Sequence, residues 1–167
     1  MVMRWSKALL TAAIALFATL VAFGNVTDYG TNFEFVQHVL RMDTIFPEAG
    51  IRYRSIASPL AHHVAYIFII ALEALTAVLC WAGAARMVKS LQKSAHEFNR
   101  SKRLAIAGLT LGFLVWQAGF MSIGGEWFGM WMSAEWNGVP SAFRFLATIG
   151  IVLIYVAQRD GEMDESP

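Results

Sequence analysis

The sequence has few charged residues and a single cysteine, and both shortages restrict what the protein is. Only 15% of its 167 residues are charged and 57% are hydrophobic, whereas soluble domains carry roughly 25% charged residues. A net charge of +1 excludes a strongly basic nucleic-acid-binding protein, so no nucleic-acid partner is expected. Cys80 cannot form a disulfide within the chain. It lies in an apolar run beside Trp81, which indicates a packing residue.

The signatures of soluble enzymes are missing as well. The sequence contains no Walker loop, no dinucleotide-binding glycine pattern, no zinc-binding helix motif and no serine elbow. We therefore predict no catalytic residue and no metal site. Internal repeats and prolines inside the apolar segments, which are typical of secondary transporters, are missing too.

Long apolar segments dominate what is present. A membrane-spanning helix needs about 20 apolar residues. Four segments qualify, at about 8–24, 62–85, 104–123 and 141–157. We therefore predict an all-α fold in one domain, a four-helix polytopic bundle in contact with the lipid bilayer.

The first apolar segment has an alternative interpretation as a cleaved signal peptide. Arg4 and Lys7 precede it, and Ala22-Phe23-Gly24 could pass as a cleavage site. The apolar stretch is longer than the usual length of about 7 to 15 residues. We favour a retained helix that packs with the other three.

Lysine and arginine are distributed unequally among the connecting segments. With both termini in the cytoplasm, nine of these residues lie inside and four outside, which the positive-inside rule favours. The outer loops are then 25–61 and 124–140, the cytoplasmic loop is 86–103, and an acidic tail covers 158–167. We expect the tail from Asp160 to be a disordered end because it has little apolar surface.

The outer loops contain an amphipathic segment and many aromatic residues. Thr31 and Glu34 have the spacing of a capping box before a helical apolar pattern that ends ahead of Pro47. We therefore predict an ordered loop helix. The aromatic residues are a belt at the membrane interface or a surface that binds a partner. They are Phe33, Phe35, Trp127, Phe128, Trp131 and Trp136.

Glu73 lies in the middle of the second apolar segment, where an ionised carboxylate is costly unless it is paired or hydrated. One interpretation is a structural polar network of Glu73, Gln117 and Arg144 in the bundle interior. The alternative is a site that exchanges a proton or holds a cation in a cavity open to the outer face. Tyr66 and Thr76 share the helix face of Glu73 and would line that path.

Histidines raise a redox hypothesis. His62 and His63 begin the second segment and His38 lies in the first loop, so pairs of them are candidate ligands for haem b or for a quinone. The spacing argues against it, because His62 and His63 are adjacent and face differently. The other interpretation is that these are polar histidines at the interface.

Two outer segments also carry a resemblance to a known family. Residues 24–44, which begin Gly24-Asn25-Val26-Thr27-Asp28-Tyr29-Gly30, and the motifs Gly124-Gly125-Glu126-Trp127-Phe128 and Trp136-Asn137-Gly138 resemble the bacterial family of predicted small integral membrane proteins, a domain of unknown function. The resemblance covers essentially the whole chain. It implies a four-helix protein of the bacterial inner membrane and no known reaction.

From these observations we predict a non-catalytic accessory, stabilising or assembly subunit of a larger membrane complex, for example a respiratory one. Its partners would be other membrane subunits or further copies of the chain. A small oligomeric carrier of protons or solutes centred on Glu73 is the first alternative. A haem-binding or quinone-binding membrane subunit is the second.

Overall fold

The computed structural model describes residues 1–162, and these residues form helices joined by turns, with no strand among them. Four helical stretches are long and apolar enough to cross a membrane. They are Val2–Thr27, Pro59–Lys89, Ala95–Trp127 and Val139–Ala157. The predicted all-α bundle with four spans is confirmed.

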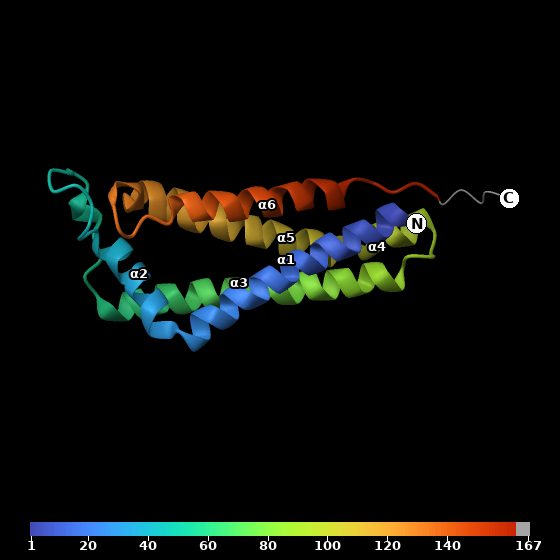
Figure 1. Cartoon of the computed structure of the whole chain (residues 1–167), viewed down its shortest axis with the longest axis horizontal. Coiled ribbons are helices and arrows are strands. Elements are labelled where there is room, and N and C mark those ends of the chain that lie inside the picture. The colour runs from blue at the N-terminus through green and yellow to red at the C-terminus, as the bar shows by residue number, and fades with distance from the viewer. Residues whose placement is uncertain (163–167) are drawn as a thin grey trace.

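The helices run side by side in an up-and-down arrangement (Figure 1). Their bounds are α1 (Val2–Thr27), α2 (Tyr29–Arg41), α3 (Pro59–Lys89), α4 (Ala95–Ser101), α5 (Arg103–Leu114) with its π-helical continuation η2 (Val115–Trp127), and α6 (Val139–Ala157). Short 3₁₀ turns lie at η1 (Arg52–Arg54) and η3 (Met130–Met132). The neighbours around the bundle are α1, α3, α5 and α6 in that order.

The two ends of the bundle differ. The N-terminus, α4 and the last described residues lie at one end, which we call the basic end (Figure 1). At the other end α2 lies across the bundle, and we call this the capped end. Four spans, with the N-terminus and the last described residues at one end, agree with the predicted topology. That the basic end faces the cytoplasm stays a prediction from charge.

The predicted loop helix exists as α2, but the predicted capping box does not form. Asp28, at the N-cap, makes no side-chain cap hydrogen bond. Thr31 and Glu34 lie inside the first two turns and are exposed. The reason is that α1 ends at Thr27 and α2 begins at Tyr29, so a single residue separates the two helices. The first turn of α2 therefore begins before Thr31, and Thr31 is not in the N-cap position. Met42 ends α2 in a left-handed conformation with φ 53.

The third span departs from a regular α-helix. Residues from Val115 to Trp127 form a π-helix, with the amide of Phe128 donating to the carbonyl of Ile123 at 3.0 Å. The predicted boundary at 123 is therefore four residues short. Such wide turns are rare and occur mostly as single turns, frequently at functional sites. This segment places Trp116 and Phe120 beside the cavity described below.

Close packing of α3 on α5 depends on glycine. A Cβ at Gly108 would lie 2.8 Å from Sγ of Cys80 and 2.9 Å from Cβ of Leu79. Gly83 is tighter still, since a Cβ there would lie even closer to the backbone nitrogen of Ala105. Cys80 is fully buried in this contact, as expected of a packing residue. The small residues therefore serve contacts inside the bundle.

We expect Gly108→Leu to lower the free energy of unfolding by about 2–3 kcal/mol, because Leu79 and Cys80 leave no room for a side chain. Thermal unfolding of the detergent-solubilised protein measures the effect. Gly24→Ala in α1 is the control, since no atom beyond its own turn of helix lies within 4 Å of a Cβ there. Equal melting temperatures for the two variants would contradict the close contact of α3 and α5.

The start of the acidic tail is ordered, which corrects the prediction of a disordered end for residues 160–162. The Asp160 carboxylate accepts from Nζ of Lys7 at 2.8 Å and from Nζ of Lys102. Arg4 donates to the carbonyl oxygens of Leu91 at 2.9 Å and Gly161 at 3.1 Å. The tail was predicted to be disordered because of its low apolar content. Its first residues are held in place because the buried lysines pair with the Asp160 carboxylate. The prediction for residues 163–167 lies outside the described residues.

Burial alone would raise the pKa of Asp160. The hydrogen bonds and positive charges of Lys102 and Lys7 outweigh it, and they hold the pKa of this carboxyl below its ordinary 3.8. The two lysine side chains are 2% exposed and the Asp160 side chain is 7% exposed. This buried cluster joins α1, the start of α5 and the segment after α6.

Candidate functional site

Glu73 lies on the inner face of α3 and is 4% exposed. Tyr66, two helical turns earlier on the same face, is 2% exposed. The sequence predicts that Tyr66 and Glu73 share a face, because residues seven apart lie on the same side of an α-helix. The structure therefore places a carboxyl group inside the bundle, in the half nearer the capped end.

The side chain that Glu73 contacts comes from α1. Nδ2 of Asn25 donates to Oε2 of Glu73 at 2.7 Å. The carbonyl oxygen of Asn25 accepts from the Tyr66 hydroxyl at 3.1 Å. Asn25 lies in the last turn of α1, so one residue holds that turn against two positions of α3. Oε1 of Glu73 receives no hydrogen bond from residues 1–162.

A cavity of about 350 Å³ opens above Glu73 toward the capped end. All of α1, α2, α3, η2 and α6 contribute to its wall. Polar groups from Asn32, Asn137 and Ser141 lie in the upper part. The volume falls in the range of about 300–1,000 Å³ that small-molecule sites occupy.

Aromatic rings form much of the wall. The ring of Trp116 lies 4.6 Å from that of Phe120 and 4.8 Å from that of Phe145, centroid to centroid. Phe35 from α2 and Tyr66 from α3 also line the cavity. No lysine, arginine or histidine lines it in the described part of the chain. The chemistry is therefore one acidic group surrounded by aromatic faces, without a cation to balance it.

The cavity is closed on the side of the basic end. Below Glu73 the remaining void measures about 10 Å³ and is lined by residues such as Thr76, Gly112 and Ile149, which is room for one water at most. The Thr76 hydroxyl donates to the carbonyl of Leu72 at 2.8 Å. Within the described residues no wide path therefore continues from the cavity toward the basic end, and Thr76 does not extend a polar one.

The predicted network of Glu73, Gln117 and Arg144 is not formed. Arg144 is exposed and donates to Oγ of Ser141 at 3.0 Å. Gln117 makes no side-chain hydrogen bond within residues 1–162, and it does not line the Glu73 cavity. Arg144 faces outward because a long cationic side chain near a helix end reaches the interface at low cost. Asn25 takes the place that was expected for Gln117.

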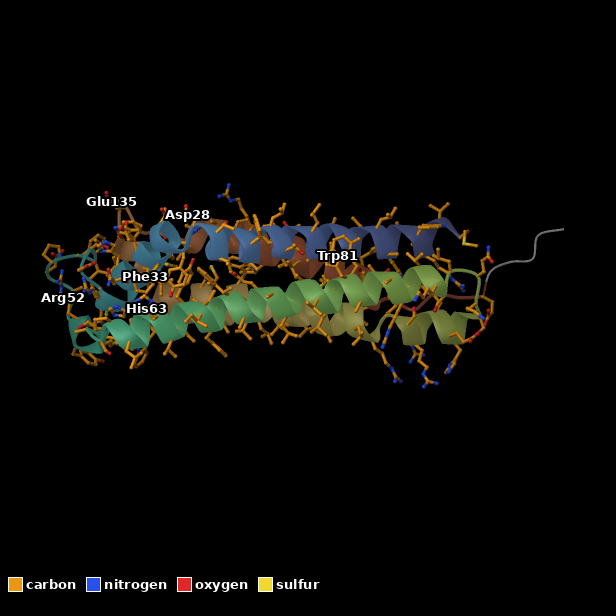
Figure 2. All side chains as sticks on the ribbon, turned by 90° about the horizontal axis from the view of Figure 1, so that it is seen from below. Asp28, Phe33, Arg52, His63, Trp81 and Glu135 are labelled. Carbon is orange, nitrogen blue, oxygen red and sulfur yellow. The ribbon has the colours of Figure 1, made fainter. Side chains whose placement is uncertain are left out.

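The three histidines of the haem or quinone hypothesis lie in separate contacts. His38 pairs with Asp43 at 2.9 Å. Nε2 of His62 contacts the carbonyl of Ile56 at 2.7 Å. His63 stacks on Phe33 at 4.1 Å, ring centroid to centroid, and Figure 2 shows these two side by side. The three histidine side chains therefore have different partners, and no described contact joins one histidine ring to another.

The predicted aromatic surface divides into exposed and packed residues. Trp127 is 52% exposed and Trp131 is 46% exposed. Phe128 is 6% exposed and packs with Met42 and Ile45 in a small core under the capped end. The remaining members, Phe33, Phe35 and Trp136, are half-buried.

Asn25 was missed at the sequence level, although it is the first polar residue after the first apolar segment.

We expect Asn25→Leu to lower the free energy of unfolding by about 1–3 kcal/mol, because Glu73 stays buried without a donor. The double variant Asn25→Leu with Glu73→Leu should recover part of this loss, since both polar partners are then removed. Thermal unfolding of Asn25→Leu, Glu73→Leu and the double variant gives the coupling free energy between the two side chains. Strictly additive effects would contradict the pairing.

The fold and the location of the site define a small integral membrane protein with four spans. The chain belongs to the family described as predicted small integral membrane protein, which it matches over residues 3–159. No curated protein and no solved structure matches the chain.

Proposed function

We propose that this membrane protein binds a small organic cation in the Glu73 cavity. The single observation that carries the proposal is a buried carboxyl group, one oxygen of which receives no hydrogen bond from residues 1–162, at the floor of an aromatic cavity lined by no described lysine, arginine or histidine. A ligand ammonium would satisfy that oxygen with a charge-assisted hydrogen bond. The faces of Trp116, Phe120 and Phe145 would attract the same positive charge.

Binding to the purified protein tests the proposal. Benzylammonium carries the charge and an aromatic ring, and benzyl alcohol is its neutral counterpart of similar shape. Calorimetric titration should detect saturable binding of benzylammonium and at least tenfold weaker binding of benzyl alcohol. Equal affinities, or no saturable binding of either compound, would contradict a cation site.

A carrier of protons or solutes extends this proposal. In that case a cation that enters the cavity would release a proton from Glu73 to the same side, and Glu73 would take up a proton again when the cation leaves on the other side. Uptake of labelled benzylammonium into proteoliposomes, driven by a pH gradient, tests it. Binding without uptake would support a binding protein and contradict a carrier.

An accessory subunit of a larger membrane complex is the second candidate. Exposed aromatic residues at the capped end favour it: Trp127, Trp131, Tyr53 at 78% exposed and Phe46 at 47% exposed. Gentle extraction followed by mass spectrometry should recover a stoichiometric partner subunit. Trp127→Ala with Trp131→Ala should lose that partner, whereas Trp81→Ala, on α3 away from the capped end, should keep it. Recovery of the chain alone would contradict this candidate.

We propose the bacterial inner membrane as the location, with the basic end in the cytoplasm. The resemblance to a bacterial family and the excess of lysine and arginine at that end support this orientation. The Glu73 cavity would then load from the outside.

A further inference from the structure

A second hollow lies at the basic end, far from Glu73. It measures about 410 Å³ and lies between α4, α5 and the segment that follows α6. Arg100, Arg103 and Arg159 each line it from a different one of these segments, together with His96 and Lys102. Figure 2 shows nitrogen-tipped side chains projecting at this end of the bundle.

Among the cations that line this hollow, Lys102 pairs with Asp160, but the three arginines pair with no carboxylate within residues 1–162. Asp160 is held by Lys7 and Lys102. Glu97 accepts from Ser94, and Glu162 accepts from the amide of Ala95. No described carboxylate pairs with Arg100, Arg103 or Arg159, and all three are exposed. Three guanidinium groups around one hollow are suited to an anion that carries more than one phosphate charge.

The remaining wall indicates that the anion is part of a lipid. Ile106 and Ala157 line the same hollow. Ile106 follows Arg103 by one turn of α5, and Ala157 is the last residue of α6, so both lie on the ends of membrane-spanning helices. The hollow therefore passes from guanidinium groups to apolar side chains in the direction of the bilayer. A soluble phosphate compound would contact only the guanidinium groups. A phospholipid would contact the guanidinium groups with its phosphate and the apolar side chains with its acyl chains.

We propose that this hollow binds the head group of a diphosphate phospholipid of the cardiolipin type, with the acyl chains lying along α5 and α6. Basic pockets between helices on the cytoplasmic side of a membrane are known to hold such head groups. The site is separate from the Glu73 cavity, and its occupant is an anion.

Native mass spectrometry of the full-length protein in detergent, titrated with cardiolipin, phosphatidylglycerol or phosphatidylcholine, tests the proposal. We expect one cardiolipin to be retained, with lower retention of phosphatidylglycerol and none of phosphatidylcholine. Arg103→Gln with Arg159→Gln should weaken cardiolipin binding about 30-fold, since each charge near the surface contributes about fivefold. The control removes two exposed arginines from the capped end, Arg41→Gln with Arg144→Gln, and should change binding less than twofold.

Four results would overturn the proposal. The first is equal retention of phosphatidylcholine, and the second is an equal loss of binding in the control variant. The third is displacement of cardiolipin by inorganic phosphate alone, which would identify a soluble phosphate compound as the occupant. The variant Asp164→Asn with Glu165→Gln should bind cardiolipin within twofold of the unmodified chain. A large gain there would identify the tail of the chain as the occupant and would also overturn the proposal.

Discussion

Glu73→Gln is expected to weaken benzylammonium binding by about 30-fold or more. Truncating one side of a buried charge pair costs about 2–5 kcal/mol, and about 2 kcal/mol corresponds to 30-fold. The amide keeps the size of the carboxyl group, and its oxygen still accepts from Asn25. The substitution therefore removes the charge without emptying the cavity floor. Calorimetric titration measures the change, and the melting temperature should stay close to that of the unmodified protein.

Glu126→Gln is the matched control, since Glu126 is an exposed carboxylate at the end of η2 near the capped end. It changes the net charge by the same amount as Glu73→Gln. We expect it to leave benzylammonium binding within twofold. An equal loss in both variants would mean that the general negative charge of this end attracts the cation, and the cavity would not be the site.

Asp160→Asn should lower the free energy of unfolding by about 3–5 kcal/mol at neutral pH, the cost of breaking a buried ion pair from one side. It leaves Lys7 and Lys102, both 2% exposed, without their carboxylate. The expected consequence is a large fall in the melting temperature of the detergent-solubilised protein. Asp43→Asn is the control, because its partner His38 and Asp43 itself are 31% and 39% exposed, and exposed pairs contribute little.

The pH dependence of the same cluster follows from the lowered pKa of Asp160. A carboxyl with a depressed pKa stabilises the fold fully at pH values above its ordinary 3.8. The stabilisation is lost as the pH falls from there through the lowered value. The difference in stability between the unmodified protein and Asp160→Asn should therefore be constant near neutral pH and shrink in acid. A difference that grows on acidification would contradict the ion cluster.

The sequence predicts the four spans well because spacing between charges and apolar length determine them directly. It also predicts that Glu73 is buried and that Tyr66 shares its face, since both follow from helical periodicity. The contact with Asn25 depends on where α1 ends relative to α3. That relation is a matter of helix packing, and neither segment alone specifies it.

The departures from prediction have related causes. Depth along each helix suggested that Gln117 and Arg144 would lie near Glu73, but depth does not determine rotation about the helix axis. The π-helical turns of η2 further change which residues of the third span face inward, and Trp116 and Phe120 line the cavity there. The ordered start of the tail depends on Lys7 and Lys102, which are distant in sequence from Asp160.

The infrared difference spectrum induced by benzylammonium is the most direct test that Glu73 is the group that binds the cation. Carboxyl and carboxylate vibrations change when such a group gains an ionic partner or loses a proton. We predict a carboxyl difference band on adding the ligand, present in the unmodified protein and in Glu126→Gln and missing in Glu73→Gln. A band that persists in Glu73→Gln, or saturable binding with no carboxyl band at all, would contradict the central claim.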